Sequence, residues 1–408
     1  RDDVESRGLG DVYKRQDDIH RINVNNTQSD KIYSTENKKF DEFYDCIKFN
    51  IWIEYFNKIR NNISGKNWID FEKEISNVIK NLVERRNYCL TKEPLESDYF
   101  EYLNELCKII KNFLDANSEL TYGNLRGCLV STINKDQIDD ILSVLLKDLN
   151  RLTRALDIYI SYFIGDIAIE NKVDEIQNIN PDYVLSFNYS DTYERKYGSQ
   201  KNIKQYCYIH GKADVNHTVE NCNLILGIDE FLHGERKNKE LESLPFKKFY
   251  QRIYKSPDNH YLDWVDEIKD GYTDYIKRQE NNKYKYEQEI KNGSVMHQFQ
   301  RLSFEETFNE KPPRHKVYIF GHSLDETDKD ILKLFICNDN VETKIYYYRK
   351  NEDDKEALGK IIQNLIKIMG QKELIRRTGG VHKTIEFIPQ RVVSENYPDT
   401  DAGEFPIA

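Results

Sequence analysis

The sequence contains no CxxC pair, the spacing on which many zinc and thioredoxin-like sites are built. Its seven cysteines are an odd number and are scattered at positions 46, 89, 107, 128, 207, 222 and 337. Several lie on apolar faces, where a cysteine is typically a small buried side chain. The sequence therefore predicts no metal site, and its free cysteines indicate a reducing, cytoplasmic location.

Long apolar runs are also missing, since none approaches the ~20 residues that a membrane-spanning helix requires. No signal peptide is visible. Positive charge is not in excess either, because the formal net charge at pH 7 is −10. We therefore expect neither a membrane nor a nucleic acid as a partner.

Aromatic residues are plentiful, and 28 Tyr and 19 Phe can build a core although 32% of the residues are charged. At 408 residues the chain has room for two or three domains, or for one large domain with insertions. Residues 1–16 differ in composition from the rest, and we expect a non-native remnant there. Residues 17–39 are expected to be a disordered lead, and residues 391–408 a polar tail.

The first half of the chain shows helical spacing of apolar residues. This spacing predicts helices over about 40–59, 68–82, 95–115 and 136–163. Helical and charged segments return between residues 233 and 310, including the stretch KKFYQRIYKS at 247–256. Later helices are expected at 328–336 and 352–370.

Short apolar runs rich in β-branched and aromatic residues predict strands in the middle and at the end of the chain. They lie at 183–187, 205–209, 224–226, 317–320, 343–348 and 384–388. Because strands alternate with helices, the sequence predicts an α/β fold with a mainly parallel sheet. We expect one domain over 40–390 with helical insertions at about 68–165 and 233–310, since strands lie on both sides of the second insertion.

Polar clusters follow three of these strands. They consist of Asn188, Tyr189, Ser190, Asp191 and Thr192 after the first, His210 and Gly211 after the second, and Gly321, His322 and Ser323 after the fourth. In an open α/β sheet, ligands bind outside the carboxyl ends of the strands. The three clusters together therefore predict a binding pocket.

Each cluster also has a purely structural explanation. Asp191, Thr192, Ser323 and Asp325 are residue types that cap helices, and Gly321 suits a tight turn. A histidine at a strand end, such as His210, is satisfied by a structural hydrogen bond about as often as it is catalytic. The other histidines show no ligand spacing and are expected on the surface or in the core; they are residues 20, 217, 233, 260, 297, 315 and 382.

The sequence resembles the bacteriophage abortive infection AbiH family through four motifs and their order along the chain, together with WIDFEKEI at 68–75 and the KKFYQRI stretch. The motifs are SFNYSDTYE, IHG, LILGID and IFGHSLDETDKDIL. The resemblance covers roughly residues 40–390. It implies a defence protein, and the expected partners are a phage-derived trigger and further copies of the chain in a homo-oligomer.

AbiH-like proteins are in turn similar to sirtuin-like, Rossmann-type NAD-binding domains. That resemblance implies that Asn188 and His210 are catalytic, and that Gly321, His322, Ser323, Tyr189, Asp191 and Gly211 bind NAD or a related nucleotide. Ser190 stands where the sirtuin-like pattern has Asp, and Asp191 follows one place later. The family's opening strand and its Gly-Asn-Gly-Phe-Asp-Leu-like phosphate loop are missing, so we expect an N-terminally truncated sequence.

The expected chemistry is cleavage of a ribose–nicotinamide bond, with NAD depletion as the defence. His210 would be the general base, because an imidazole titrates near neutral pH, and Asn188 would position the water or the ribose. The alternative is a non-catalytic module that senses a nucleotide or a phage component. A nuclease is a third option, but no Asp/Glu-x-Lys cluster at strand spacing supports its metal site.

Overall fold

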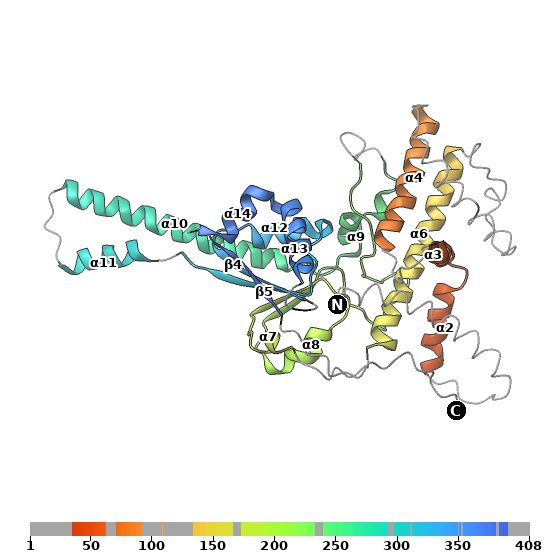
Figure 1. Cartoon of the computed structure of the whole chain (residues 1–408), viewed down its shortest axis with the longest axis horizontal. Helices are drawn as coiled ribbons and strands as arrows, with labels where there is room; N and C mark the ends of the chain where they lie inside the picture. Colours follow the sequence, from red (N-terminus) through yellow and green to blue (C-terminus); the bar gives the residue numbers. More distant parts are fainter. Residues whose placement is uncertain are drawn as a thin grey trace. The chain divides into compact units, whose positions relative to one another are not determined.

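The computed structural model divides into two compact units, Arg1–Asn259 and His260–Ala408. It describes residues 35–62, 71–91, 108, 134–165, 173–232, 240–292, 298–310, 312–349, 351, 354–380 and 383–390. Figure 1 gives the labels of the helices and strands. The expected remnant at 1–16, the polar tail and nearly all of the helix expected at 95–115 lie outside the described residues.

The first unit begins with helices, as the apolar spacing predicts. They are α2 (Thr35–Ile47), α3 (Ile51–Asn62), α4 (Phe71–Thr91) and α6 (Lys135–Ile158), and α6 continues as the π-helical turn η1 (Tyr159–Phe163). The single helix expected over 40–59 is wrong, because the chain breaks at Phe49, whose φ is +51°. Asn50 Oδ1 accepts the Trp52 amide at 3.0 Å, and Asp148 Oδ2 accepts the Ile51 amide at 2.8 Å. These two side chains satisfy the first amides of α3 and so start a new helix.

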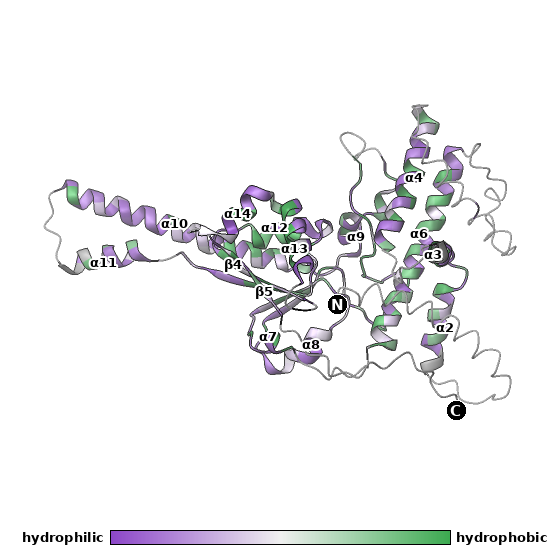
Figure 2. Cartoon of the chain, viewed as in Figure 1, coloured by the Kyte–Doolittle hydropathy of each residue, from purple (hydrophilic) through white to green (hydrophobic). Residues whose placement is uncertain are grey.

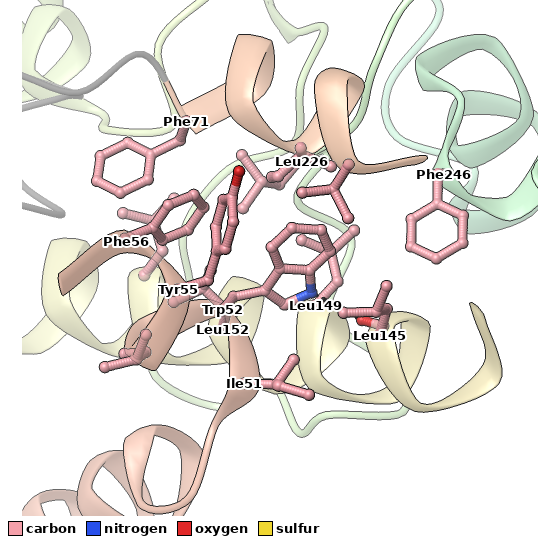
Figure 3. Packing of buried hydrophobic residues seen from close by; sticks show 14 of the residues in the cluster. Ile51, Trp52, Tyr55, Phe56, Phe71, Leu145, Leu149, Leu152, Leu226 and Phe246 are labelled. Carbon is pink, nitrogen blue, oxygen red and sulfur yellow. Dashed lines mark hydrogen bonds between the residues drawn. The ribbon is translucent and has the colours of Figure 1, made fainter. Parts of the chain in front are cut away.

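The core of the first unit forms around Trp52, which is fully buried (Figure 3). Its indole stacks on Phe56 at 5.9 Å between ring centroids and meets Tyr55 edge-on at 6.3 Å. The indole Nε1 donates to the carbonyl of Leu145 on α6 at 2.8 Å. Side chains spaced three or four residues apart along α3 and α6 face this core, which is the arrangement that amphipathic helices produce.

Two strands follow the helices of the first unit. β1 (Tyr183–Ser186) and β2 (Gln205–Tyr208) pair in parallel, with Tyr183 opposite Gln205 and Ser186 opposite Tyr208. Between and around them lie α7 (Asp174–Gln177), α8 (Thr192–Tyr197), η2 (Gly198–Gln200), η4 (Leu244–Phe246) and α9 (Lys248–Lys255). Both strands agree with the sequence prediction to within one residue.

The strand expected at Leu224–Leu226 is wrong. The segment is buried, but its backbone bonds to a loop and to side chains rather than to a neighbouring strand. The Ile225 amide donates to the His210 carbonyl at 2.8 Å, Lys255 Nζ donates to Leu224 O at 2.7 Å, and Gln251 Nε2 donates to Leu226 O at 3.0 Å. A short apolar run indicates burial, and the hydrogen-bond partners decide its conformation.

The second unit is a three-stranded parallel sheet with its own helices. The sheet has the order β3-β4-β5, formed by β3 (His315–Phe320), β4 (Val341–Tyr347) and β5 (Ile385–Pro389). The helices are α10 (Tyr261–Lys291), α11 (Gln298–Asn309), η5 (Glu326–Asp328), α12 (Lys329–Ile336), α13 (Lys355–Met369) and α14 (Gln371–Thr378). Figure 2 shows that α10 is largely hydrophilic. Its Tyr286 ring contacts Phe304 and Phe308 of α11, at 5.5 Å in both cases.

The described part of the chain is therefore a mixed α/β protein whose strand pairs are parallel, as predicted. The described strands pair as two small sheets, one in each unit, and not as the one sheet that the sequence suggested. Among the described residues, no helix combines the length and apolar character needed to cross a membrane.

Candidate functional site

The carboxyl ends of β1 and β2 lie side by side, because the strands are parallel and in register through Ser186 and Tyr208. The Ile209 amide extends the pairing by donating to Ser186 O at 3.0 Å. The residues that follow each strand therefore leave the sheet as neighbours. The structure thus brings the Asn188–Asp191 cluster and the His210–Gly211 cluster together, as the sequence predicted from strand ends.

His210 is buried, with 7% of its surface exposed. Its imidazole packs edge-on against Phe187 at 5.8 Å and Tyr189 at 6.4 Å between ring centroids. Tyr189 is itself buried, and its hydroxyl donates to Ile225 O at 2.5 Å. Asn188, between the two aromatic residues, is exposed. The buried imidazole and the exposed amide therefore belong to two segments that leave the sheet as neighbours, and an imidazole is a group that can deprotonate a hydroxyl.

Gly211 allows an unusually close backbone contact next to His210. Its φ is +88°, and a Cβ atom placed there would lie 2.5 Å from Asn223 O and 2.9 Å from Asn223 Oδ1. Asn223 Oδ1 is buried, and no hydrogen bond reaches it from the part of the chain that the structure describes. A buried polar atom of this kind favours a polar ligand or water as its partner.

Substituting Gly211 with alanine should lower the free energy of unfolding by about 1–3 kcal/mol, the usual cost of a strained backbone position. Both the left-handed φ and the contact with the Asn223 backbone oppose a Cβ. Urea unfolding followed by circular dichroism measures the change. Gly271→Ala is the matched control, because a Cβ at Gly271 meets nothing within 4 Å. Equal stability of the Gly211→Ala variant and the wild type would contradict the strain.

Charged side chains surround these strand ends. Glu194 Oε2 accepts from Lys212 Nζ at 2.7 Å and from the Tyr208 hydroxyl at 3.0 Å. The hydrogen bond from Lys212 holds the pKa of Glu194 below its ordinary value, and burial raises the pKa of Tyr208. Asp191 pairs with Arg195 at 2.8 Å and lies 3.7 Å from Lys212. The cluster has equal numbers of acidic and basic groups, so its net charge is zero.

Asp191 precedes α8, where capping was the structural explanation for it. Its side chain makes no capping hydrogen bond, and it pairs with Arg195 one turn later instead. Capping therefore does not explain Asp191. Asp325 does cap a helix, since its side chain accepts the Thr327 amide at 3.1 Å, but the capped element is the short η5 and not the helix α12 that follows it.

The remaining predicted residues belong to the second unit, after β3. Gly321 is exposed with a φ of +62°. His322 Nδ1 accepts a hydrogen bond from the Leu324 amide at 2.8 Å, so the ring proton lies on the other nitrogen, Nε2. Nε2 lies 3.6 Å from Asp328 Oδ2. Ser323 is exposed, and its carbonyl accepts from Asn364 Nδ2 at 3.0 Å. These contacts define a second polar turn at the end of a parallel strand.

A buried polar cluster in the first unit was not predicted from the sequence. Asp157, on α6, accepts from His217 Nδ1 at 2.8 Å, from Arg154 Nη1 at 2.7 Å and from the Asp214 amide at 2.8 Å. Cys222 belongs to the same cluster, and burial raises the pKa of its thiol to about 12. The available signal was the five-residue spacing of His217 and Cys222 in a loop after His210.

Comparison with known proteins gives one family match. The model of the family described as "Bacteriophage abortive infection AbiH" matches residues 30–349. No curated protein and no solved structure matches the chain. The matched range includes both strand ends of the first unit and the polar turn after β3, in agreement with the motifs SFNYSDTYE, IHG and IFGHSLDETD. Since the match covers most of its length, the chain belongs to the bacteriophage abortive infection AbiH family.

Proposed function

We propose that this chain acts in bacteriophage abortive infection by hydrolysing NAD or a related nucleotide at the carboxyl ends of β1 and β2. The family implies the abortive-infection role. One observation supports the proposed chemistry: parallel pairing makes the segment after β1, which carries the exposed Asn188, and the segment after β2, which carries the buried His210, leave the sheet as neighbours. An imidazole that packing holds in one position is suited to general-base catalysis, because its orientation costs no further entropy.

In the proposed reaction, a water molecule attacks the ribose carbon that carries nicotinamide. The new carbon–oxygen bond forms as the carbon–nitrogen bond breaks, and the bonding electron pair goes to the nicotinamide ring nitrogen, which becomes neutral. His210 takes the proton of the water, and Asn188 positions the water or a ribose hydroxyl. The products are nicotinamide and the hydroxylated ribose nucleotide, with one proton released.

The residues at the strand ends suit a sugar. Asn223 Oδ1 is buried beside Gly211 and is available as an acceptor for a hydroxyl group. Lys212 and Arg195 are balanced by Glu194 and Asp191, so the surroundings favour a neutral group over an isolated charge. Tyr189 supports the site from below, because its ring packs on His210. The nucleotide-binding roles of Gly321, His322 and Ser323 stay predictions from the sirtuin-like resemblance.

The test is NAD loss over time in bacteria that carry the chain and are infected with phage, which supplies any trigger. We expect His210→Gln to slow NAD loss by about 100-fold, at the lower end of what a general base contributes. Asn188→Ala should slow it as well. The matched control is His260→Gln, because His260 is an exposed histidine whose replacement should leave the rate unchanged.

Constant NAD during infection that the chain nevertheless aborts would overturn the hydrolase proposal. The chain would then be a sensing module that binds a nucleotide or a phage component without turning it over. Binding of a radiolabelled nucleotide to the purified chain, weakened by His210→Gln but without product, would identify that outcome.

A further inference from the structure

The cluster of Asp157, His217 and Cys222 has the composition of a metal site. One possible ligand atom from each residue lies within 4.8 Å of the other two. Asp157 is completely buried, Cys222 is 5% exposed, and His217 reaches the surface with part of its side chain. We propose that these three residues bind one divalent transition-metal ion, with Zn²⁺ as the expected ion. This inference is independent of the proposed NAD chemistry.

The donor atoms favour zinc over the hard cations. A thiolate, an imidazole nitrogen and a carboxylate oxygen are ligands that Zn²⁺ commonly combines, whereas Mg²⁺ and Ca²⁺ prefer oxygen alone. Zinc bond lengths of about 2.0–2.3 Å place tetrahedral ligand atoms roughly 3.3–3.8 Å apart. In this cluster Asp157 Oδ2 and His217 Nδ1 are 2.8 Å apart, and no pair exceeds 4.8 Å. A small outward shift of the hydrogen-bonded pair would admit the ion.

Surrounding hydrogen bonds hold the carboxylate ligand in place. The Asp214 amide donates to Asp157 Oδ1 at 2.8 Å, and Arg154 Nη1 donates to Oδ2 at 2.7 Å. Arg154 is balanced in turn by Glu42 at 2.8 Å. Outer contacts of this kind orient metal ligands and raise metal affinity. With a thiolate at Cys222 and a carboxylate at Asp157, a divalent ion leaves the three-ligand group neutral.

The two loop ligands come from one short turn that is already closed. The Cys222 amide donates to Thr218 O at 3.0 Å, and the Thr218 amide donates to Asn221 Oδ1 at 2.6 Å. The turn therefore presents His217 and Cys222 to α6, and binding an ion would cost little further conformational entropy. Three protein ligands leave one tetrahedral position for water, and the partly exposed His217 marks the path by which an ion would enter.

The position of the cluster indicates what the ion would do. Through coordination by His217, Cys222 and Asp157, it would link the segment between Gly211 and Asn223 to α6. That segment also bonds to the strand ends, since the Ala213 amide donates to Tyr189 O at 2.9 Å. We therefore expect the bound ion to hold the loop beside His210 in place.

The experiment uses the full chain, purified, loaded with Zn²⁺ and freed of excess metal. Its metal content is measured by inductively coupled plasma mass spectrometry, and a parallel sample is loaded with Co²⁺ for absorption spectroscopy. We expect one Zn²⁺ per chain, and with Co²⁺ a sulfur-to-cobalt charge-transfer band together with intense visible bands of tetrahedral geometry. Cys222→Ser should remove the charge-transfer band, and His217→Gln should reduce the bound metal to well below one ion per chain.

Cys207→Ser is the matched control, because Cys207 is also a buried cysteine of the same unit but lies outside the cluster. It should keep both the ion and the charge-transfer band. Circular dichroism establishes that each variant is folded, and His217→Gln, which changes a partly exposed residue, decides the result if Cys222→Ser does not fold. A folded wild type that retains no stoichiometric Zn²⁺, or a Co²⁺ spectrum unchanged by Cys222→Ser, would overturn the proposal.

Discussion

Replacing Arg154 with methionine should lower the free energy of unfolding by about 3–5 kcal/mol, the cost of leaving one partner of a buried ion pair alone. Arg154 is completely buried and donates to Glu42, to Asp157 and to the carbonyls of Asp214 and Val215. Methionine fills a similar volume but removes the guanidinium that pairs with the Asp157 carboxylate in the protein interior. Urea unfolding followed by circular dichroism measures the effect.

Lys147→Ala is the control for this experiment. Lys147 is an exposed cation on the same helix, so its removal should change the free energy of unfolding by less than about 0.5 kcal/mol. If Arg154→Met were as stable as Lys147→Ala, the loop after β2 would not depend on this ion pair. Such a result would also weaken the support that Arg154 gives to Asp157 in the proposed metal site.

Truncating Trp52 to alanine should cost about 3–5 kcal/mol of stability, as for other buried tryptophans. Trp52 has no exposed surface and packs between Tyr55, Phe56 and the side chains of α6 (Figure 3). The cavity left by the indole cannot close, because helices on both sides are held by their other contacts. The measurement is the denaturant midpoint together with the slope of the transition.

Trp52→Phe separates the ring from the hydrogen bond. Phenylalanine keeps an aromatic ring in the core but loses the Nε1 donor to Leu145 O. We expect this variant to retain most of the stability that the alanine variant loses, because a single neutral hydrogen bond contributes only about 1 kcal/mol. Equal losses in the two variants would mean that the hydrogen bond, and not the packing, makes Trp52 important.

Local patterns in the sequence predicted the elements that depend on nearby residues. The apolar spacing of 136–163 identified α6 and η1, and the apolar runs identified all five strands of the described chain to within about two residues. The break at Phe49 could not be predicted in the same way. It depends on Asp148, which caps the Ile51 amide from 97 residues away.

In the candidate site, too, the features that depend on nearby residues were predicted and those that depend on distant residues were not. Polar residues directly after strands pointed to His210 and Asn188, because parallel strands bring their carboxyl ends together. Asp157 and His217 are 60 residues apart, and nothing in the spacing of either residue indicates the other. Asn223 was missed for a similar reason, since its contact with Gly211 arises only when the loop folds back on β2.

The division of the chain into two compact units has a consequence for its synthesis. Domains fold as units, the N-terminal one first, while the ribosome adds about 5–20 residues per second. The unit Arg1–Asn259 is complete before His260 is translated. We therefore expect the first unit, including the loop around His217 and Cys222, to have on the order of ten seconds to fold before synthesis of the second unit ends. If translation stalled early in the second unit, the nascent chain on the ribosome would already contain the folded strand ends of β1 and β2.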